Sequence, residues 1–252
     1  MLLRVINPNT TASMTALIGA SARAAASPGT TVEAVTSVMG PASIESHYDE
    51  ALAVPGVLRA IMDSDADGYV IACFGDPGLD AAREITSRPV VGIAEAAMHA
   101  ATLIGRGFSV VTSLGRTLGR AHDLATRYVA AGACRGVHAC DIPVLRLESD
   151  PGVRKKVLDL AREALTADGS DVIVLGCAGL ADLPAWLSAE LGVPVIDGVA
   201  AATTLVQSLV TLGLRTSGRD EYAAPPPKAY TGILRAFTTT ARIDPCPAAD
   251  PR

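Results

Sequence analysis

Two stretches of the chain repeat one another, and this repetition decides the fold. Residues 69–104 read YVIACFGDPGLDAAREITSRPVVGIAEAAMHAATLI, and residues 171–206 read DVIVLGCAGLADLPAWLSAELGVPVIDGVAAATTLV. Each stretch has an apolar strand, a cysteine, a glycine-containing turn, a helix, a Pro-Val strand and an Ala-rich helix. Pro89 follows Cys73 at nearly the same spacing as Pro194 follows Cys177. The two cysteines therefore occupy nearly equivalent places in an internal repeat.

Short β-branched runs alternate with Ala-rich stretches of helical spacing along the whole chain, which is typical of βα units and a parallel sheet. Strands are predicted at Leu2–Ile6, Thr31–Val35, Gly68–Ala72, Val90–Ile93, Phe108–Thr112, Val144–Leu147, Asp171–Leu175 and Val193–Ile196. Helices are predicted at Thr11–Ala26, Ala51–Ser64, Ala81–Thr86, Ala94–Leu103, Thr117–Ala131, Val153–Asp168 and Val199–Leu212.

Two similar halves predict an α/β protein with two parallel-sheet domains related by an approximate twofold axis. We expect residues 1–97 with 206–237 to form the first domain, 98–205 the second, and 238–252 a disordered tail. Ligands of open parallel sheets bind beyond the carboxyl ends of the strands, where both cysteines lie. The sequence therefore predicts an active site between the two domains.

Composition and charge narrow the class of partner. Lys and Arg total 21 against 26 Asp and Glu, with no basic block, which argues against a nucleic-acid partner. No apolar run is long enough for a membrane span, and the N-terminus lacks the pattern of a signal peptide, so we expect a cytoplasmic protein without a membrane partner. Five cysteines are an odd number, which favours free thiols over a disulfide framework.

A pair of thiols can move a proton between the two faces of an acidic carbon, because one thiolate removes it and the opposite thiol replaces it. Asp76-Pro77-Gly78 has the pattern of a helix N-cap, which predicts a positive helix end beside Cys73 and a lowered thiol pKa there. The alternative is that Cys73 and Cys177 are buried core thiols, since free cysteine is often buried. Their equivalent places after two repeated strands favour the catalytic interpretation.

Other polar residues have weaker patterns. Cys134, His138 and Cys140 lack a second ligand pair at metal-site spacing, so we expect them to be structural. The Asn7–Thr10 loop offers amides to a ligand, and Thr112 and Ser113 occupy the matching place in the other half. No dinucleotide or phosphate-binding motif follows a strand, so neither a cofactor nor a metal is expected.

These motifs together resemble the Asp/Glu/hydantoin racemase superfamily, and within it the hydantoin and allantoin racemases. The resemblance reaches from the N-terminus to about residue 230, and the matching segments are INPNTT (6–11), GPASIES (40–46), ACFGDPGL (72–79), the RE pair and PVVGIAEAA (83–97), FSVVTS (108–113), LGCAGLADL (175–183) and GVPVIDGVAAA (192–202). The tail beyond about Gly232 departs from the family pattern.

The resemblance implies two flavodoxin-like domains with a site at their interface and catalytic roles for Cys73 and Cys177. It implies a cofactor-independent, homo-oligomeric racemase of 5-substituted hydantoins or allantoin. Substrate contacts carried over from the family fall on Pro8, Asn9, Ser43, Phe74, Thr112, Ser113 and Ala178. The presence of both cysteines argues against the arylmalonate decarboxylases, which retain one.

Three alternatives stay open: an amino-acid racemase of the Asp/Glu type, a maleate cis-trans isomerase, and a small-molecule-binding protein without catalysis. Phe74 and the small residues around Cys177 predict a cleft without charged anchors. Such a cleft suits a neutral ring better than a dicarboxylic amino acid.

Overall fold

The computed structural model describes residues 1–238, and apart from its first residue the tail predicted at 238–252 lies outside them. The first half contains β1 (Leu2–Asn7), α1 (Ala12–Ala25), β2 (Thr31–Thr36), α2 (His47–Met62), β3 (Gly68–Ile71), α3 (Leu79–Ile85), β4 (Val90–Gly92) and α4 (Ile93–Ile104). The second half contains β5 (Phe108–Thr112), α5 (Leu118–Tyr128), β6 (Cys134–Ala139), α6 (Val153–Asp168), β7 (Val172–Leu175), α7 (Pro184–Leu191), β8 (Val195–Asp197) and α8 (Gly198–Thr211).

The two halves have the same sheet topology. The strand order is β2-β1-β3-β4 in one sheet and β6-β5-β7-β8 in the other, and all pairs are parallel. The predicted α/β class with two repeated parallel sheets is confirmed. Strands β3 and β7 are buried along their whole length, because helices cover both faces of each sheet. Their carboxyl ends lead into the two turns that contain the cysteines, which are called the Cys73 turn (residues 73–78) and the Cys177 turn (residues 176–180).

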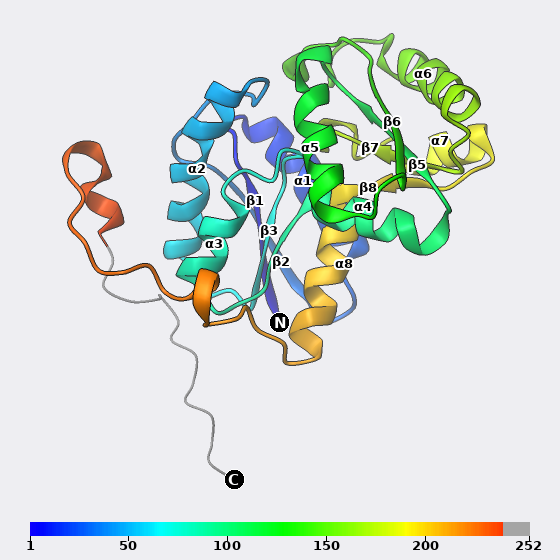
Figure 1. Cartoon of the computed structure of the whole chain (residues 1–252). Coiled ribbons are helices and arrows are strands. Elements are labelled where there is room, and N and C mark those ends of the chain that lie inside the picture. Colours follow the sequence, from blue (N-terminus) through cyan, green and yellow to red (C-terminus); the bar gives the residue numbers. More distant parts are fainter. Residues whose placement is uncertain (239–252) are drawn as a thin grey trace.

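The last helix of each half crosses to the sheet of the other half (Figure 1). Helix α4 follows the first sheet, but its apolar face packs with β5 and β7 of the second. Helix α8 follows the second sheet and packs with β1, β3 and β4 of the first. The starts of these helices meet closely, since a Cβ on Gly198 would lie 2.6 Å from the carbonyl oxygen of Ile93. This exchange fixes the two sheets against each other; the boundaries after 97 and 205 stay a prediction.

One predicted strand is wrong. Val144–Leu147 was expected as a strand, but Val144–Arg146 form a single 3₁₀ turn, and the strand of this region is β6. Strand β6 lies at the sheet edge and alternates poorly, with Gly136 and His138 on it, so its period-two signal is weak. The amide of Val144 bonds to the Glu45 side chain instead of a neighbouring strand.

Helix α7 is the helix that the second repeated stretch was predicted to contain before its Pro-Val strand. It begins at Pro184, a residue well suited to the first helical turn. Among residues 1–238, no helix is both long enough and apolar enough to cross a membrane.

Candidate active site

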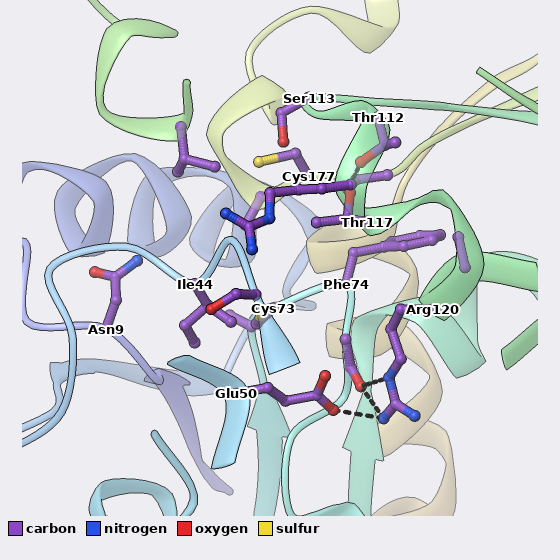
Figure 2. Close-up of a pocket in the computed structure, with 18 of the residues that line it drawn as sticks. Asn9, Ile44, Glu50, Cys73, Phe74, Thr112, Ser113, Thr117, Arg120 and Cys177 are labelled. Carbon is purple, nitrogen blue, oxygen red and sulfur yellow. Dashed lines mark hydrogen bonds and ion pairs between the residues drawn. The ribbon is translucent and has the colours of Figure 1, made fainter. Parts of the chain in front are cut away.

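The two cysteines line one cleft between the sheets. Cys73 follows β3 after one residue, Cys177 follows β7 after one residue, and both contribute to the same pocket. The pocket has about 770 Å³ of free space, part of which is open to solvent. Figure 2 shows the two side chains approaching this space from the ribbons of different halves. The repeat therefore places two equivalent thiols at one cavity.

Both cysteines are half-buried at the cleft, and this burial raises the pKa of their thiols. Burial raises the pKa of Cys73 to about 12, although the amide of Gly75 partly offsets the effect. Burial raises the pKa of Cys177 to about 11, against the favourable influence of the Gly179 amide and the Ser113 hydroxyl. Each thiol is therefore neutral at physiological pH without substrate. The predicted lowering of the Cys73 pKa by a helix end is wrong.

The reason lies in the Cys73 turn. Asp76 was expected to cap the helix that follows it, but α3 begins at Leu79 with Gly78 at its N-cap. The Asp76 carboxylate instead accepts the amides of Ala94 and Glu95 at the start of α4. Because α3 begins only at Leu79, burial rather than the end of this helix dominates the pKa of Cys73.

The Cys177 turn is held by the strand beside it. The Thr112 hydroxyl at the end of β5 donates to the carbonyl of Gly176 at 2.8 Å. Gly176 has no space for a side chain, since a Cβ would lie 2.8 Å from the Thr112 Cβ. Ser113 places its hydroxyl within hydrogen-bonding range of the Cys177 thiol. Thr112 and Ser113 therefore fix the Cys177 side of the cleft (Figure 2).

The Asn7–Asn9 loop forms a buried amide network on the first half. The Asn7 side-chain amide donates to Asn9 Oδ1 at 2.9 Å and to the Thr15 hydroxyl at 3.0 Å. Asn9 Oδ1 also accepts the amide of Thr11, and Asn9 Nδ2 contacts the Met14 sulfur at 3.4 Å. This network leaves the Asn9 amide at the cleft wall.

The cleft contains most of the predicted binding residues. Those that line it are Asn9, Phe74, Thr112, Ser113 and Ala178. Pro8 is buried behind the wall and does not line the cleft. Ser43 does not line it either. Its hydroxyl donates to Glu45 at 3.2 Å. Glu45 in turn accepts the amide of Val144, which joins the first half to the second.

A charged wall was missed by the sequence analysis. Glu50 of α2 and Arg120 of α5 line the cleft and form an ion pair at 2.7 Å, and His47 and Arg116 line it too. Arg120 also donates to the carbonyl of Gly75 at 2.6 and 3.2 Å, so it binds the Cys73 turn from the other half (Figure 2). The predicted absence of charged anchors is wrong. These residues belong to no motif, and only the folded chain brings the two helices together.

Glu50 keeps part of its acceptor capacity for the cleft. Its ion pair with Arg120 uses one carboxylate oxygen, and partial burial raises the pKa of this carboxyl. The wall therefore presents a carboxylate acceptor beside guanidinium donors.

The remaining histidine and cysteine candidates do not line the cleft. His138 pairs with Asp168 at 2.6 Å on the second sheet, and Cys140 is buried in the core. Cys134 is half-buried at the start of β6, and His99 is exposed on α4. Within the described part of the chain, no three His, Cys, Asp or Glu side chains are arranged to hold a metal ion.

Known proteins match this chain in sequence and in structure over nearly its whole length. The family model described as Asp/Glu/Hydantoin racemase matches residues 3–206. A hydantoin racemase of Pseudomonas sp. is 44% identical over 241 residues, covering 94% of this chain and 97% of the relative. A hydantoin racemase of Rhizobium meliloti is 47% identical over 236 residues, covering 92% and 98%. The structure of an allantoin racemase from Klebsiella pneumoniae is 50% identical with a TM-score of 0.92, covering 94% and 99%.

Proposed function

Because the chain belongs to the Asp/Glu/hydantoin racemase family, we propose that it racemises 5-substituted hydantoins, allantoin among them, through proton transfer at C5 by Cys73 and Cys177. The similar proteins are named hydantoin racemase and allantoin racemase, and racemases are isomerases, which supports this proposal. One observation carries the mechanism: equivalent turns of the two halves bring two thiols to one cleft.

The two thiols divide the reaction between them. The thiolate of one cysteine takes the proton from C5, so its S–H bond forms while the C5–H bond breaks and the electron pair moves into the adjacent carbonyl as an enolate. The thiol of the other cysteine then gives its proton to the opposite face of C5 and becomes the thiolate. The reverse turnover restores the first state. The proposal requires neither a metal nor another cofactor.

Removal of water from the two sulfurs by the bound substrate has an energetic role in this proposal. In the free enzyme the raised pKa values leave little thiolate at neutral pH. A bound hydantoin ring presents an acidic C–H and replaces water around the sulfurs, so the proton is exchanged between groups that share one dry site. The Gly75 and Gly179 amides favour the thiolate as it forms.

The charged wall supports a particular kind of 5-substituent. Arg120 and Arg116 are donors, whereas Glu50 is an acceptor, so a ureido group with both N–H and carbonyl functions complements them. An alkyl or aryl substituent would make no hydrogen bond to these groups and would displace water from them, which disfavours its binding. We therefore place allantoin ahead of apolar hydantoins as the preferred substrate.

A screen of single enantiomers in D₂O tests the proposed function. Allantoin, 5-isopropylhydantoin, 5-benzylhydantoin, aspartate and glutamate are followed by circular dichroism and by proton NMR. We expect loss of optical activity and deuterium at C5 of the hydantoins, fastest for allantoin. Racemisation of aspartate or glutamate alone would assign the amino-acid racemase alternative, which the guanidinium groups at the wall would favour. Ligand binding without deuterium incorporation would indicate a non-catalytic binding protein.

We also propose that the enzyme is a homo-oligomer and that it is located in the cytoplasm. Light scattering after size-exclusion chromatography tests the oligomeric state, and cell fractionation tests the location.

A further inference from the structure

One buried carboxylate fastens the Cys73 turn to the crossing helix α4. Asp76 Oδ1 accepts the amide of Ala94 at 3.0 Å, and Oδ2 accepts the amide of Glu95 at 2.9 Å. The amide of Asp76 donates to the carbonyl of Cys73 at 2.9 Å, which closes the turn. The same residue therefore holds both the turn and the helix.

The backbone of Asp76 is held in an uncommon conformation. Its φ is +47°, a region that side-chain-bearing residues rarely adopt, and the residue is 3% exposed. Gly92 makes room for the carboxylate, since a Cβ there would lie 2.2 Å from the Asp76 Cγ. Such a conformation persists only when surrounding contacts determine it. The two amide contacts to α4 supply that support.

The other half has a different carboxylate at the start of its crossing helix. Asp197 accepts the amides of Val199 and Ala200 at 2.9 and 3.1 Å, so it caps the crossing helix α8. However, Asp197 is the N-cap residue of α8 itself and does not belong to the Cys177 turn. Within residues 1–238, no hydrogen bond joins Asp197 to the residues 176–180. The chain thus contains a matched carboxylate that caps a crossing helix without holding a cysteine.

We propose that Asp76 is a positioning residue for Cys73: it anchors the cysteine turn to α4, and its ionisation places a negative charge that makes the Cys73 thiol harder to deprotonate. The role of Asp197 is limited to its helix. The two cysteines are therefore unequal acids, although their backbones are related by the repeat.

The groups around Asp76 come from several elements. Burial raises the pKa of the Asp76 carboxyl to about 7, and the charge of Glu95 on α4 acts in the same direction. The Tyr128 hydroxyl of α5 lies within hydrogen-bonding range of the carboxyl and favours its charged form. Glu95 is itself paired with Arg83 of α3 at 2.6 Å. Asp76 therefore changes charge near neutral pH.

The Cys73 thiol faces further charges. Glu50 of α2 and, across the cleft, the thiolate form of Cys177 both raise its pKa, as Asp76 does. Above pH 7 the ionised Asp76 adds to this opposition. The turn of Cys177 contains no acidic residue from 177 to 180, and its thiol has the Ser113 hydroxyl as a partner, although the charges of Cys140 and Glu45 also raise its pKa. If the proposed function holds, Cys177 is the thiol that forms its thiolate more readily in the free enzyme.

Alkylation of the free enzyme by iodoacetamide tests Asp76 without any substrate. The rate at each cysteine is measured by peptide mass spectrometry between pH 6 and 8.5 in the parent, Asp76→Asn and Asp197→Asn proteins. Well below a thiol pKa, the logarithm of the rate rises by about one unit per pH unit, because thiolate is the reacting species. We expect this slope at Cys177 in all three proteins. At Cys73 we expect a smaller slope in the parent and in Asp197→Asn, and the full slope in Asp76→Asn.

Two results would overturn the inference. One is an equal slope at Cys73 in the parent and in Asp76→Asn, even if the variant reacts faster at every pH, since a loosened turn alone gives that pattern. The other is a full slope at Cys73 in the parent, which tests the inference even if Asp76→Asn does not fold. A missing hydantoin racemase activity with the expected slopes would reject the proposed function and leave the role of Asp76 intact.

Discussion

The two cysteine turns occupy equivalent positions but are held by different groups. The Cys73 turn is held by Asp76, which caps α4, and by Arg120, which reaches it from the other half. The Cys177 turn is held by Thr112 of the adjacent strand in its own half. The first turn thus accepts hydrogen bonds from the other half, whereas the hydrogen bond from Thr112 to the second turn comes from the adjacent strand of its own sheet.

This difference shows how a repeated backbone can supply two unlike acid and base groups. The repeat fixes where the strands end, so it brings both thiols to one cavity. The neighbours of each thiol are not repeated, because Asp76 and Glu50 act on Cys73, whereas the Ser113 hydroxyl and the more weakly acting Glu45 are the corresponding groups at Cys177. Mutations can therefore separate the role of the common framework from the role of each turn.

Removal of either thiol is the largest change, and it tests whether the turns are functionally joined. Cys73→Ser and Cys177→Ser should each lower kcat/KM for racemisation on the order of a thousandfold or more, because each removes one acid-base group. Racemisation is followed by circular dichroism on both enantiomers. Cys134→Ser, which removes a half-buried thiol at the start of β6 that does not line the cleft, is the matched control. Full activity of either cleft variant would contradict the joint role.

Loss of the contact between the halves should affect the Cys73 turn next most strongly. Arg120→Met removes the donors to Gly75 and the ion pair with Glu50, so the turn loses its support from α5. A small displacement of a reacting group can lower the rate on the order of a hundredfold, and we expect a decrease in kcat/KM approaching that size. Arg127→Met is the control, since Arg127 lies on the same helix as Arg120 but pairs with Asp80 of α3 and does not line the cleft. Equal effects of the two variants would assign Arg120 to stability alone.

The pH dependence follows from the raised thiol pKa values. Burial raises both thiol pKa values to about 11 and 12, so the catalytic thiolate is scarce at neutral pH and increases as pH rises. Well below these values, thiolate increases about tenfold per pH unit. We therefore expect kcat/KM for a neutral substrate to rise close to tenfold from pH 6.5 to 7.5, after correction for uncatalysed racemisation. A pH-independent value over this range would show that the free enzyme already holds a thiolate.

The smallest expected effect concerns the support of Cys177. Thr112→Val keeps the side-chain shape but removes the hydroxyl that donates to the Gly176 carbonyl. We expect a loss of about 1 kcal/mol in the free energy of unfolding, measured in urea, because a buried acceptor loses its partner. Activity should fall by about fivefold, the rate equivalent of about 1 kcal/mol. Thr166→Val on the outer face of α6, where the hydroxyl bonds within its own helix, should change neither quantity measurably.

The framework was predictable from the sequence because the repeat is local and strongly patterned. The strands before Cys73 and Cys177 are apolar, so their position, parallel pairing and shared cleft follow from a comparison of the chain with itself. The edge strand β6 was misplaced, since its side chains are only partly buried and alternate weakly.

The surroundings of the thiols were not predictable in the same way. Arg120 and Glu50 are separated by many residues and have no motif, so their ion pair exists only in the folded chain. Asp76 has the sequence of a local helix cap, but its carboxylate satisfies amides of a later helix. Local propensity thus identified a capping residue but not the helix that it caps.

Proton exchange by the two single-cysteine variants tests the central claim most directly. Each enantiomer of a hydantoin substrate is incubated in D₂O with Cys73→Ser and with Cys177→Ser, and deuterium at C5 is measured separately from racemisation. We predict that each variant exchanges the C5 proton of one enantiomer, that the preferred enantiomer differs between the variants, and that neither racemises it. Exchange of the same enantiomer by both variants would contradict an arrangement in which the two thiols serve opposite faces.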